Sequence, residues 1–265
     1  MIKLVVCDMD GTMIGRDERV PDSAAEWIAS LEAQGVMFTV ATGRAEGYMR
    51  EKVAQMGLRH PYIVTNGATI MDGDRAILRR QFSIHPLRSL IEDCYAEGMS
   101  VLFTFEGTER TERITPWIVR EGEKRGCPFE PKPLSDEEWE TLQADKLLIM
   151  DPVREGKILD MEKKLQAISG DFMYVRYRLK ALELNEKSAN KAAALQTLVE
   201  SMGIPMKYVL FIGDDDNDIQ VFQAAGHSAA VGNVSDNARP YAEYVCQGHE
   251  FQGVMEAVEK FCGGL

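Results

Sequence analysis

Two carboxylates follow a short apolar run near the start of the chain. The run Leu-Val-Val-Cys, residues 4–7, leads directly to Asp8 and Asp10, and Gly11 comes next. Such a run is typical of a buried strand, and the glycine permits a turn after it. In open α/β sheets, ligands bind at the edge where the strands end. We therefore expect both acids at a ligand-binding edge.

Two carboxylates held close together raise each other's pKa unless a cation lies between them. Oxygen ligands of this kind favour Mg²⁺. The Asp-x-Asp spacing by itself also fits an ordinary turn capped by an aspartate. The rest of the chain has to decide between the two interpretations.

Two further expected strands end in polar groups. The strand at 36–41 is followed by Thr42, Gly43 and Arg44, whose hydroxyl and main-chain N–H groups could bind an anion. The alternative is that Thr42 only caps the next helix. The strand at 208–212 is followed by four aspartates within residues 214–218, either a solvated turn or a second set of cation ligands.

The elements that position these groups alternate between strand and helix. Strands are expected at 2–8, 36–41 and 62–65, with helices at 22–34 and 45–57 between them. The same texture returns at the end of the chain, with a helix at 188–202 and strands at 208–212, 228–231 and 244–245. This alternation predicts an α/β fold with a doubly wound, Rossmann-like parallel sheet.

The middle of the chain has a different order of expected strands and helices. A strand at 76–82 is expected to leave the core, and strands at 101–105, 146–150 and 173–178 follow. Helices are expected at 86–97, 116–125, 135–143 and 155–168. We therefore predict a core of residues 1–82 and 183–265, with an inserted α/β domain at 83–182.

The composition excludes some classes of partner and indicates a cellular location. The formal net charge of −12 argues against nucleic acid as a partner. No apolar stretch approaches the ~20 residues that cross a membrane, so no membrane association is expected. The five cysteines are scattered, which indicates a reducing, cytoplasmic location. Cys7 should point away from Asp8, into the core.

Together, these motifs resemble those of the haloacid dehalogenase superfamily, and most closely its Cof-type phosphatases, which carry a C2-type α/β cap. The matching segments are Asp8-Met9-Asp10-Gly11-Thr12, Ala41-Thr42-Gly43-Arg44, Lys191, Gly213-Asp214 with Asn217-Asp218, Thr65-Asn66-Gly67-Ala68, Ala230-Val231-Gly232-Asn233 and Phe251-Gln252-Gly253-Val254. The chain departs from the pattern at Ala192, where glycine is usual, and in the extra acids Asp215 and Asp216. None of these departures removes a catalytic group.

The resemblance implies a phospho-aspartate mechanism. Asp8 would attack phosphorus, and Asp10 would protonate the leaving oxygen and then deprotonate water. Mg²⁺ would be held by Asp8, the main-chain carbonyl of Asp10, and Asp214, with Asp218 acting directly or through water. The catalytic set is completed by Thr42 and Lys191.

The resemblance also implies residues that bind the phosphate or the substrate. Gly43 would donate its N–H, and Arg44, Asn66 and Asn217 lie at core strand ends. In the inserted cap, Arg176 and Arg178 would share one face of a strand, so that Arg178 could meet a second anionic group. A solvated edge is the alternative for the two cap arginines.

The function implied is a Mg²⁺-dependent phosphatase of small phosphorylated metabolites, with sugar phosphates ahead of nucleotide or cofactor phosphates. One alternative is a phosphomutase of the same superfamily. Another is a non-catalytic protein that binds a phosphorylated metabolite. The physiological substrate and the oligomeric state are not determined by the sequence.

Overall fold

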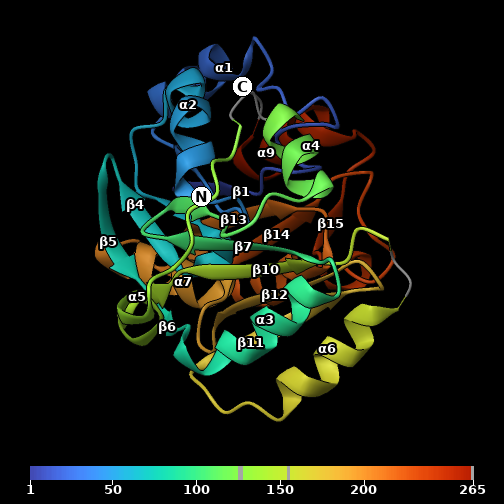
Figure 1. Ribbon diagram of the computed structural model, residues 1–265. Coiled ribbons are helices and arrows are strands. Elements are labelled where there is room, and N and C mark those ends of the chain that lie inside the picture. Colours follow the sequence, from blue (N-terminus) through green and yellow to red (C-terminus); the bar gives the residue numbers. More distant parts are fainter. Residues whose placement is uncertain (125–127, 154–155, 264–265) are drawn as a thin grey trace. The chain divides into compact units, whose positions relative to one another are not determined.

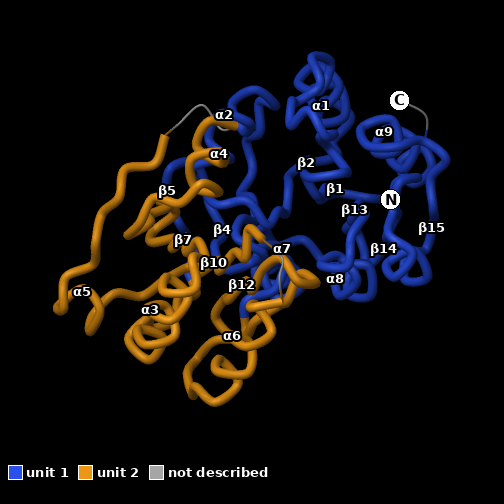
Figure 2. Tube along the Cα trace, turned by 45° about the vertical axis from the view of Figure 1, so that its right-hand side comes forward, with its two compact units in different colours: residues 1–79, 189–265 blue, residues 80–188 orange. Residues whose placement is uncertain are grey.

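The computed structural model describes residues 1–124, 128–153 and 156–263. The chain forms two compact units (Figure 2): unit 1 comprises 1–79 and 189–265, and unit 2 comprises 80–188. The sequence boundaries at 82/83 and 182/183 therefore move to 79/80 and 188/189. The reason is strand pairing, because β12 (Ala181–Glu186) is hydrogen-bonded along its whole length to unit 2 strands.

Unit 1 is built on a five-stranded sheet in which every neighbouring pair is parallel. Its strand order is β15-β14-β13-β1-β2. The bounds are β1 (Leu4–Cys7), β2 (Met37–Val40), β13 (Val209–Gly213), β14 (His227–Ala230) and β15 (Tyr244–Val245). This confirms the doubly wound, Rossmann-like core, in which β1 lies between β2 and β13 and all three carboxyl ends meet at one edge.

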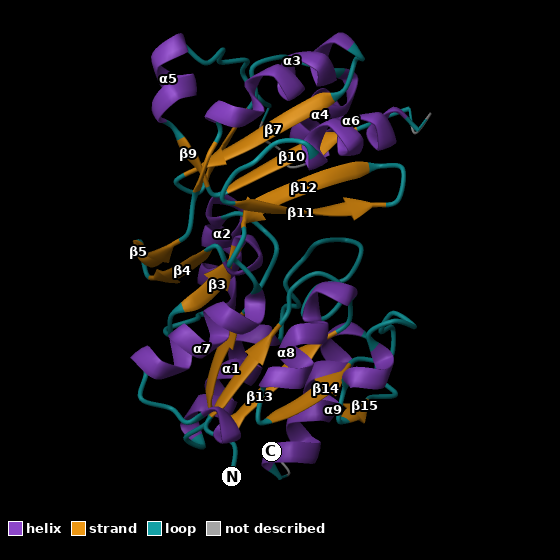
Figure 3. Ribbon diagram, turned by 90° about the horizontal axis from the view of Figure 1, so that it is seen from below, coloured by secondary structure: helices purple, strands orange, loops and turns teal. Residues whose placement is uncertain are grey.

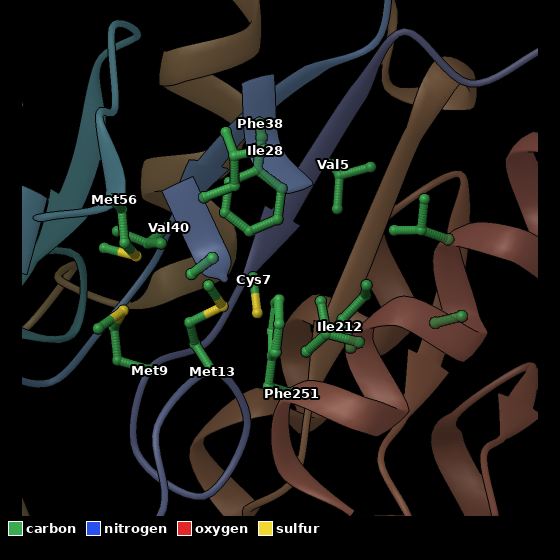
Figure 4. Close-up of a cluster of buried hydrophobic side chains, with 14 of the residues drawn as sticks. Val5, Cys7, Met9, Met13, Ile28, Phe38, Val40, Met56, Ile212 and Phe251 are labelled. Atoms are coloured by element: carbon green, nitrogen blue, oxygen red, sulfur yellow. The ribbon is translucent and has the colours of Figure 1, made fainter. Parts of the chain in front are cut away.

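Alternate residues of β1 enter different hydrophobic layers. Val5 and Cys7 pack with side chains of α1 (Ala24–Ala33), α2 (Glu46–Met56) and α9 (Glu250–Cys262). Figure 4 shows Cys7 in this layer. Leu4 and Val6 pack on the other face with α7 (Lys191–Ser201) and α8 (Ile219–Ala224). Cys7 thus has the core position expected of it. Figure 3 shows α8 and α9 beside β13 and β14.

The third strand pairs differently from its predicted role in the parallel sheet. β3 (Tyr62–Val64) meets the end of β2 through one parallel bridge, Ala41 to Ile63, and otherwise pairs antiparallel with β4 (Thr69–Asp72). β4 pairs in turn with β5 (Arg75–Arg79). The single strand expected at 76–82 is therefore wrong. Its first part closes this hairpin, and Phe82 begins β6 (Phe82–Ser83), which pairs with β9 (Gln143–Ala144).

Unit 2 has an antiparallel sheet of order β11-β12-β10-β7-β8, with α3 and α6 packed on one face (Figure 1). The strands β8 and β12 were not predicted. The bounds in unit 2 are α3 (Arg88–Ala96), β7 (Ser100–Phe105), β8 (Thr108–Arg110), α4 (Pro116–Lys124), α5 (Asp136–Thr141), β10 (Lys146–Met150), α6 (Lys157–Gln166) and β11 (Phe172–Tyr177).

Five single-turn 3₁₀ helices complete the described elements: η1 (Thr65–Gly67), η2 (His85–Leu87), η3 (Met206–Tyr208), η4 (Asp216–Asp218) and η5 (Arg239–Tyr241). Residue 125, at the end of one expected helix, and residue 155, at the start of another, lie outside the described residues, as does Cys127. The described cysteines are all free thiols. Within the described ranges, no helix is both long and apolar enough to cross a membrane.

Candidate active site at the carboxyl edge of the unit 1 sheet

The carboxyl edge of the parallel sheet brings the acidic motifs together. Asp8 directly follows β1, and Asp214 directly follows the neighbouring β13. Oxygens of Asp8, Asp214 and Asp218 lie within 4.8 Å of one another. Because adjacent parallel strands end at the same edge, the spacing of the two motifs in the sequence does not separate them in space.

Lys191 enters this carboxylate cluster as a buried cation. Its Nζ donates to Asp8 Oδ1 at 2.6 Å and to Asp218 Oδ1 at 2.7 Å. The Lys191 side chain is 1% exposed, and those of Asp8 and Asp218 are 6% and 0% exposed. Buried ion pairs of this kind cost desolvation, which makes them functional candidates rather than simple sources of stability.

The start of α7 delivers Lys191, and Gly67 makes its approach possible. Asn190 caps the helix by accepting from the N–H of Ala193 at 2.8 Å. Gly67 has a φ of +93°, and a Cβ there would lie 2.2 Å from the main-chain oxygen of Asn190. Only glycine fits this close backbone contact.

The acidic segment 214–218 forms a turn that is held by hydrogen bonds, and its aspartates make different contacts. Asp218 Oδ2 accepts from the N–H groups of Asp214 and Asp215, at 3.0 and 3.3 Å. The Asp215 side chain accepts from the N–H of Asp216, at 2.8 Å. Asp216 is held by the side chains of Ser235 and Asn237 at 2.7 and 3.0 Å. Thus Asp215 and Asp216 shape the turn, and Asp214 and Asp218 join the cluster.

The electrostatics of the cluster fit a divalent cation. Burial raises the pKa of Asp8; Lys191 opposes this rise, and Asp218 and Asp214 add to it. Burial also raises the pKa of Asp214 to about 7, although the hydrogen bond from Thr12 acts to lower it. Three carboxylates against one ammonium leave two negative charges to balance. A hard divalent cation with oxygen ligands would supply that balance.

Asp10 lies outside this carboxylate cluster and is bound by Arg44. Arg44 Nε is 2.9 Å from Asp10 Oδ2, and Nη2 is 2.6 Å from Oδ1. The same Nη2 lies 3.2 Å from Glu18 Oε2. The Asp10 side chain is 53% exposed. The group expected to contact substrate, Arg44, is therefore engaged by two carboxylates of its own chain.

The remaining predicted phosphate ligands lie at the ends of β2 and β3. Thr42 is buried, and its Oγ1 accepts from the N–H of Arg44 at 3.1 Å. Since α2 begins at Glu46 with Ala45 in the N-cap position, Thr42 does not cap that helix. The alternative interpretation of Thr42 as a helix cap is therefore wrong, and its anion-binding role stays a prediction.

Asn66 and Asn217 join the second and fourth motifs. Asn217 Nδ2 donates to Asn66 Oδ1 at 3.1 Å, and the N–H of Asn66 donates to Thr42 O at 3.0 Å. Thr65, Asn66 and Gly67 all have positive φ. Left-handed backbone is costly for a β-branched residue such as Thr65, and strain of this kind is concentrated at functional sites.

The prediction that Arg176 and Arg178 share one face of a strand is wrong. β11 ends at Tyr177, and Arg178 follows in a turn with a φ of +51°. Arg176 Nε is bound to Glu162 at 2.9 Å, and its Nη1 donates to Arg178 O at 2.8 Å. The two side chains do not share a strand face, because the strand ends between them.

Three residues of the site neighbourhood were given no role from the sequence. Thr12 Oγ1 donates to Asp214 Oδ1. Asn233 Nδ2 donates to Gly11 O at 2.7 Å, and its Oδ1 accepts from the N–H of Glu250 at 3.0 Å. Thr12 and Asn233 lie inside motifs that match the family, so the sequence did contain a signal for their roles. Glu18 stood in no motif.

Comparisons with known proteins identify the family of the chain. Residues 5–258 match the model of the haloacid dehalogenase-like hydrolases. The chain therefore belongs to this family, which confirms the predicted resemblance and its Cof-type character. Its similarity to named phosphatases bears out the expected enzyme class, a phosphoric monoester hydrolase.

Two curated relatives illustrate the similarity. A 5-amino-6-(5-phospho-D-ribitylamino)uracil phosphatase of Bacillus subtilis is 26% identical, with 97% of this chain and 94% of the relative covered. A phosphoglycolate phosphatase of Methanobrevibacter smithii is 24% identical, with 98% of each chain covered. A haloacid dehalogenase-like hydrolase structure from Bacteroides thetaiotaomicron has a TM-score of 0.83, 22% identity, and coverage of 98% of this chain and 99% of that one.

Proposed function

We propose that the chain is a Mg²⁺-dependent phosphatase of small phosphorylated metabolites that works through a phospho-aspartate on Asp8. The observation that carries this proposal is the buried contact of Lys191 with both Asp8 and Asp218, beside Asp214. A carboxylate nucleophile fixed by a permanent cation suits attack on a phosphate dianion.

The residues would divide the chemistry as follows. An Asp8 oxygen forms a bond to phosphorus as the bond to the leaving oxygen breaks. Asp10 gives its proton to that oxygen and later takes one from the water that releases phosphate. The Thr42 hydroxyl and the N–H of Gly43 would bind phosphate oxygens, as would Lys191. Asn66 and Asn217, which contact each other, would line the same phosphate site.

The metal would be held by carboxylate oxygens of Asp8 and Asp214 and by the main-chain carbonyl of Asp10, with Asp218 in support. When bound, Mg²⁺ would offset negative charge on the phosphate and on the carboxylates. Asp218 has both oxygens engaged, one by Lys191 and one by the N–H groups of the turn. This arrangement favours an outer, orienting role for Asp218.

Sugar or polyol phosphates are the substrates that we propose first. The relative named for a phosphoribityl compound supports a polyol phosphate, and the relative named for phosphoglycolate supports another small phosphomonoester. We assign selectivity to unit 2, which carries none of the motifs. Arg178 is proposed there as an anion contact from an exposed turn. A cytoplasmic location is proposed from the free thiols of the described cysteines.

A panel of phosphorylated metabolites tests this proposal, with inorganic phosphate measured in Mg²⁺ and in chelator. We expect Mg²⁺-dependent release that is lost in Asp8→Asn. Conversion of a sugar phosphate to its isomer without release of phosphate would instead identify a phosphomutase. Binding of a metabolite without either product would identify a non-catalytic protein.

A further inference from the structure

Glu18 contacts Arg44, which in turn holds the proposed acid–base residue Asp10. The Arg44 side chain is 16% exposed and lies between the two carboxylates, with Nη2 2.6 Å from Asp10 Oδ1 and 3.2 Å from Glu18 Oε2. A guanidinium is planar and carries its donors in a fixed fork. Because Nη2 contacts both carboxylates and Nε contacts Asp10, the plane of the Arg44 fork is fixed as well as its position.

The two carboxylate oxygens of Asp10 make different contacts with Arg44. Oδ1 accepts from Nη2 at 2.6 Å and from Nε at 3.1 Å, whereas Oδ2 accepts from Nε at 2.9 Å. Each carboxylate oxygen has two lone pairs. Oδ2 thus keeps a lone pair that can carry a proton while Oδ1 is held.

Glu18 is itself held in place by its surroundings. Its φ is +58°, and its N–H donates to Gly15 O at 3.0 Å. Its main-chain oxygen accepts from Lys52 Nζ, which α2 presents. A left-handed glutamate is costly and persists only where neighbouring contacts maintain it. These contacts make Glu18 a fixed anchor for Arg44.

We propose that Glu18 is a positioning residue that orients Arg44, and through Arg44 aims Asp10 Oδ2 at the leaving oxygen. This inference rests on the proposed phosphatase function. The proton on Oδ2 passes to the leaving oxygen as the bond from phosphorus to that oxygen breaks and the bond to Asp8 forms. In the second step, Oδ2 takes a proton from water as water oxygen bonds to phosphorus and Asp8 is released.

The test compares two substrates whose leaving groups differ in their need for a proton. p-Nitrophenyl phosphate expels a stable anion, whereas an alkyl phosphate needs proton donation. For Glu18→Gln, we expect kcat/KM to fall about 10-fold on the alkyl phosphate and less than about 3-fold on p-nitrophenyl phosphate. This is a partial loss, because the variant misplaces the acid without removing it, and removal would cost roughly 10²–10⁴-fold. The ratio of the two values is independent of how much of a preparation is folded.

A matched control and a double variant sharpen the test. Glu51→Gln makes the same change at an exposed site on α2, where Glu51 accepts from Gln55, and should leave the ratio unchanged. If Glu18 acts through Arg44, then Glu18→Gln combined with Arg44→Gln should be no worse than Arg44→Gln alone.

Equal losses on both substrates in Glu18→Gln would overturn the inference, as would independent effects in the double variant or a gain of activity in Arg44→Gln. In those cases the wild-type protein would still release phosphate, so the proposed function would stand. If the wild-type protein released phosphate from neither compound nor from any metabolite of the panel, the proposed function itself would fail.

Discussion

The two units differ in where several of their ion pairs lie. Unit 1 buries Lys191 between Asp8 and Asp218. In unit 2, the pairs Lys164–Asp93 and Arg88–Asp136 lie at the surface. Burying charge is expensive, and surface pairs contribute little. The comparison indicates that unit 1 bears the cost of an ion pair buried at its candidate site, a cost that these two surface pairs of unit 2 do not carry.

Sheet direction explains where the chemistry could arise. All strand pairs in the five-stranded sheet of unit 1 are parallel, so β1 and β13 end at one edge. The unit 2 sheet is antiparallel, so its strand ends are divided between two edges. A cluster of strand-end acids therefore forms naturally in unit 1. Four predictions test this contrast, beginning with the largest effect.

The largest effect is expected from Asp8→Asn, which removes the proposed nucleophile. Turnover should fall by at least about 1000-fold, because an amide oxygen is a poor nucleophile toward phosphorus. Initial rates of phosphate release measure the loss, and circular dichroism checks the fold. Asp145→Asn is the matched change in unit 2, where Asp145 accepts from Gln81 and from the N–H of Gly107. Equal losses of turnover per folded molecule would contradict the contrast.

Removing the buried cation should cost far more stability than removing a surface one. Without metal, Lys191→Met leaves Asp8 and Asp218 without their shared ammonium, and should lower the free energy of unfolding by about 3 kcal/mol. Lys164→Met breaks a surface pair with Asp93 and should cost less than about 1 kcal/mol. Urea unfolding measures both. Similar costs would show that the cluster is not held by Lys191.

The metal-free protein should lose stability as the pH rises. The folded-state pKa of Asp214 is raised from 3.8 to about 7. A carboxyl with a raised pKa contributes its stability fully below the unfolded value, and that contribution is lost as the pH passes the folded value. Tm in chelator should therefore fall between about pH 4 and pH 7. Mg²⁺ should raise Tm more at pH 8 than at pH 5, and an equal increase would argue against these ligands.

The smallest effect is expected at the helix cap of α5 in unit 2. Glu138 completes a capping box with Ser135 and accepts hydrogen bonds from Arg110. The pKa of Glu138 is lowered to about 2, mainly by the hydrogen bonds from Arg110. Glu138→Gln can keep the capping box but loses the charged contact with Arg110, and should cost at most about 1 kcal/mol at neutral pH. Because the pKa is lowered, this contribution is present above about pH 4.5 and lost toward pH 2. Urea unfolding at several pH values measures this loss of unfolding free energy, and Glu137→Gln, at an exposed position, is the control. If the loss in Glu138→Gln did not change with pH, the charged contact with Arg110 would be excluded as its cause.

The sequence predicted most of unit 1 and less of unit 2. The strands of the parallel sheet are near-continuous apolar runs, because they are buried on both faces. β12 has the sequence Ala-Leu-Glu-Leu-Asn-Glu, in which acidic residues lower the strand preference, and it was missed. β4 was missed because it follows the turn residues Asn66 and Gly67 and belongs to a small three-stranded antiparallel sheet with β3 and β5.

What the sequence determined by itself was the place of the acidic motifs at the ends of β1 and β13, since the residue that follows a buried strand must emerge at the sheet edge. The tertiary structure decided the partners of the long side chains. Arg44 could reach a substrate or Asp10, 34 positions away, and only packing around α2 and the Glu18 turn selects the carboxylates. Arg178 turned out to be in a turn for the same reason, because the end of β11 depends on its pairing with β12. Local spacing fixes where the backbone places a residue, and contacts distant in sequence fix what its side chain meets.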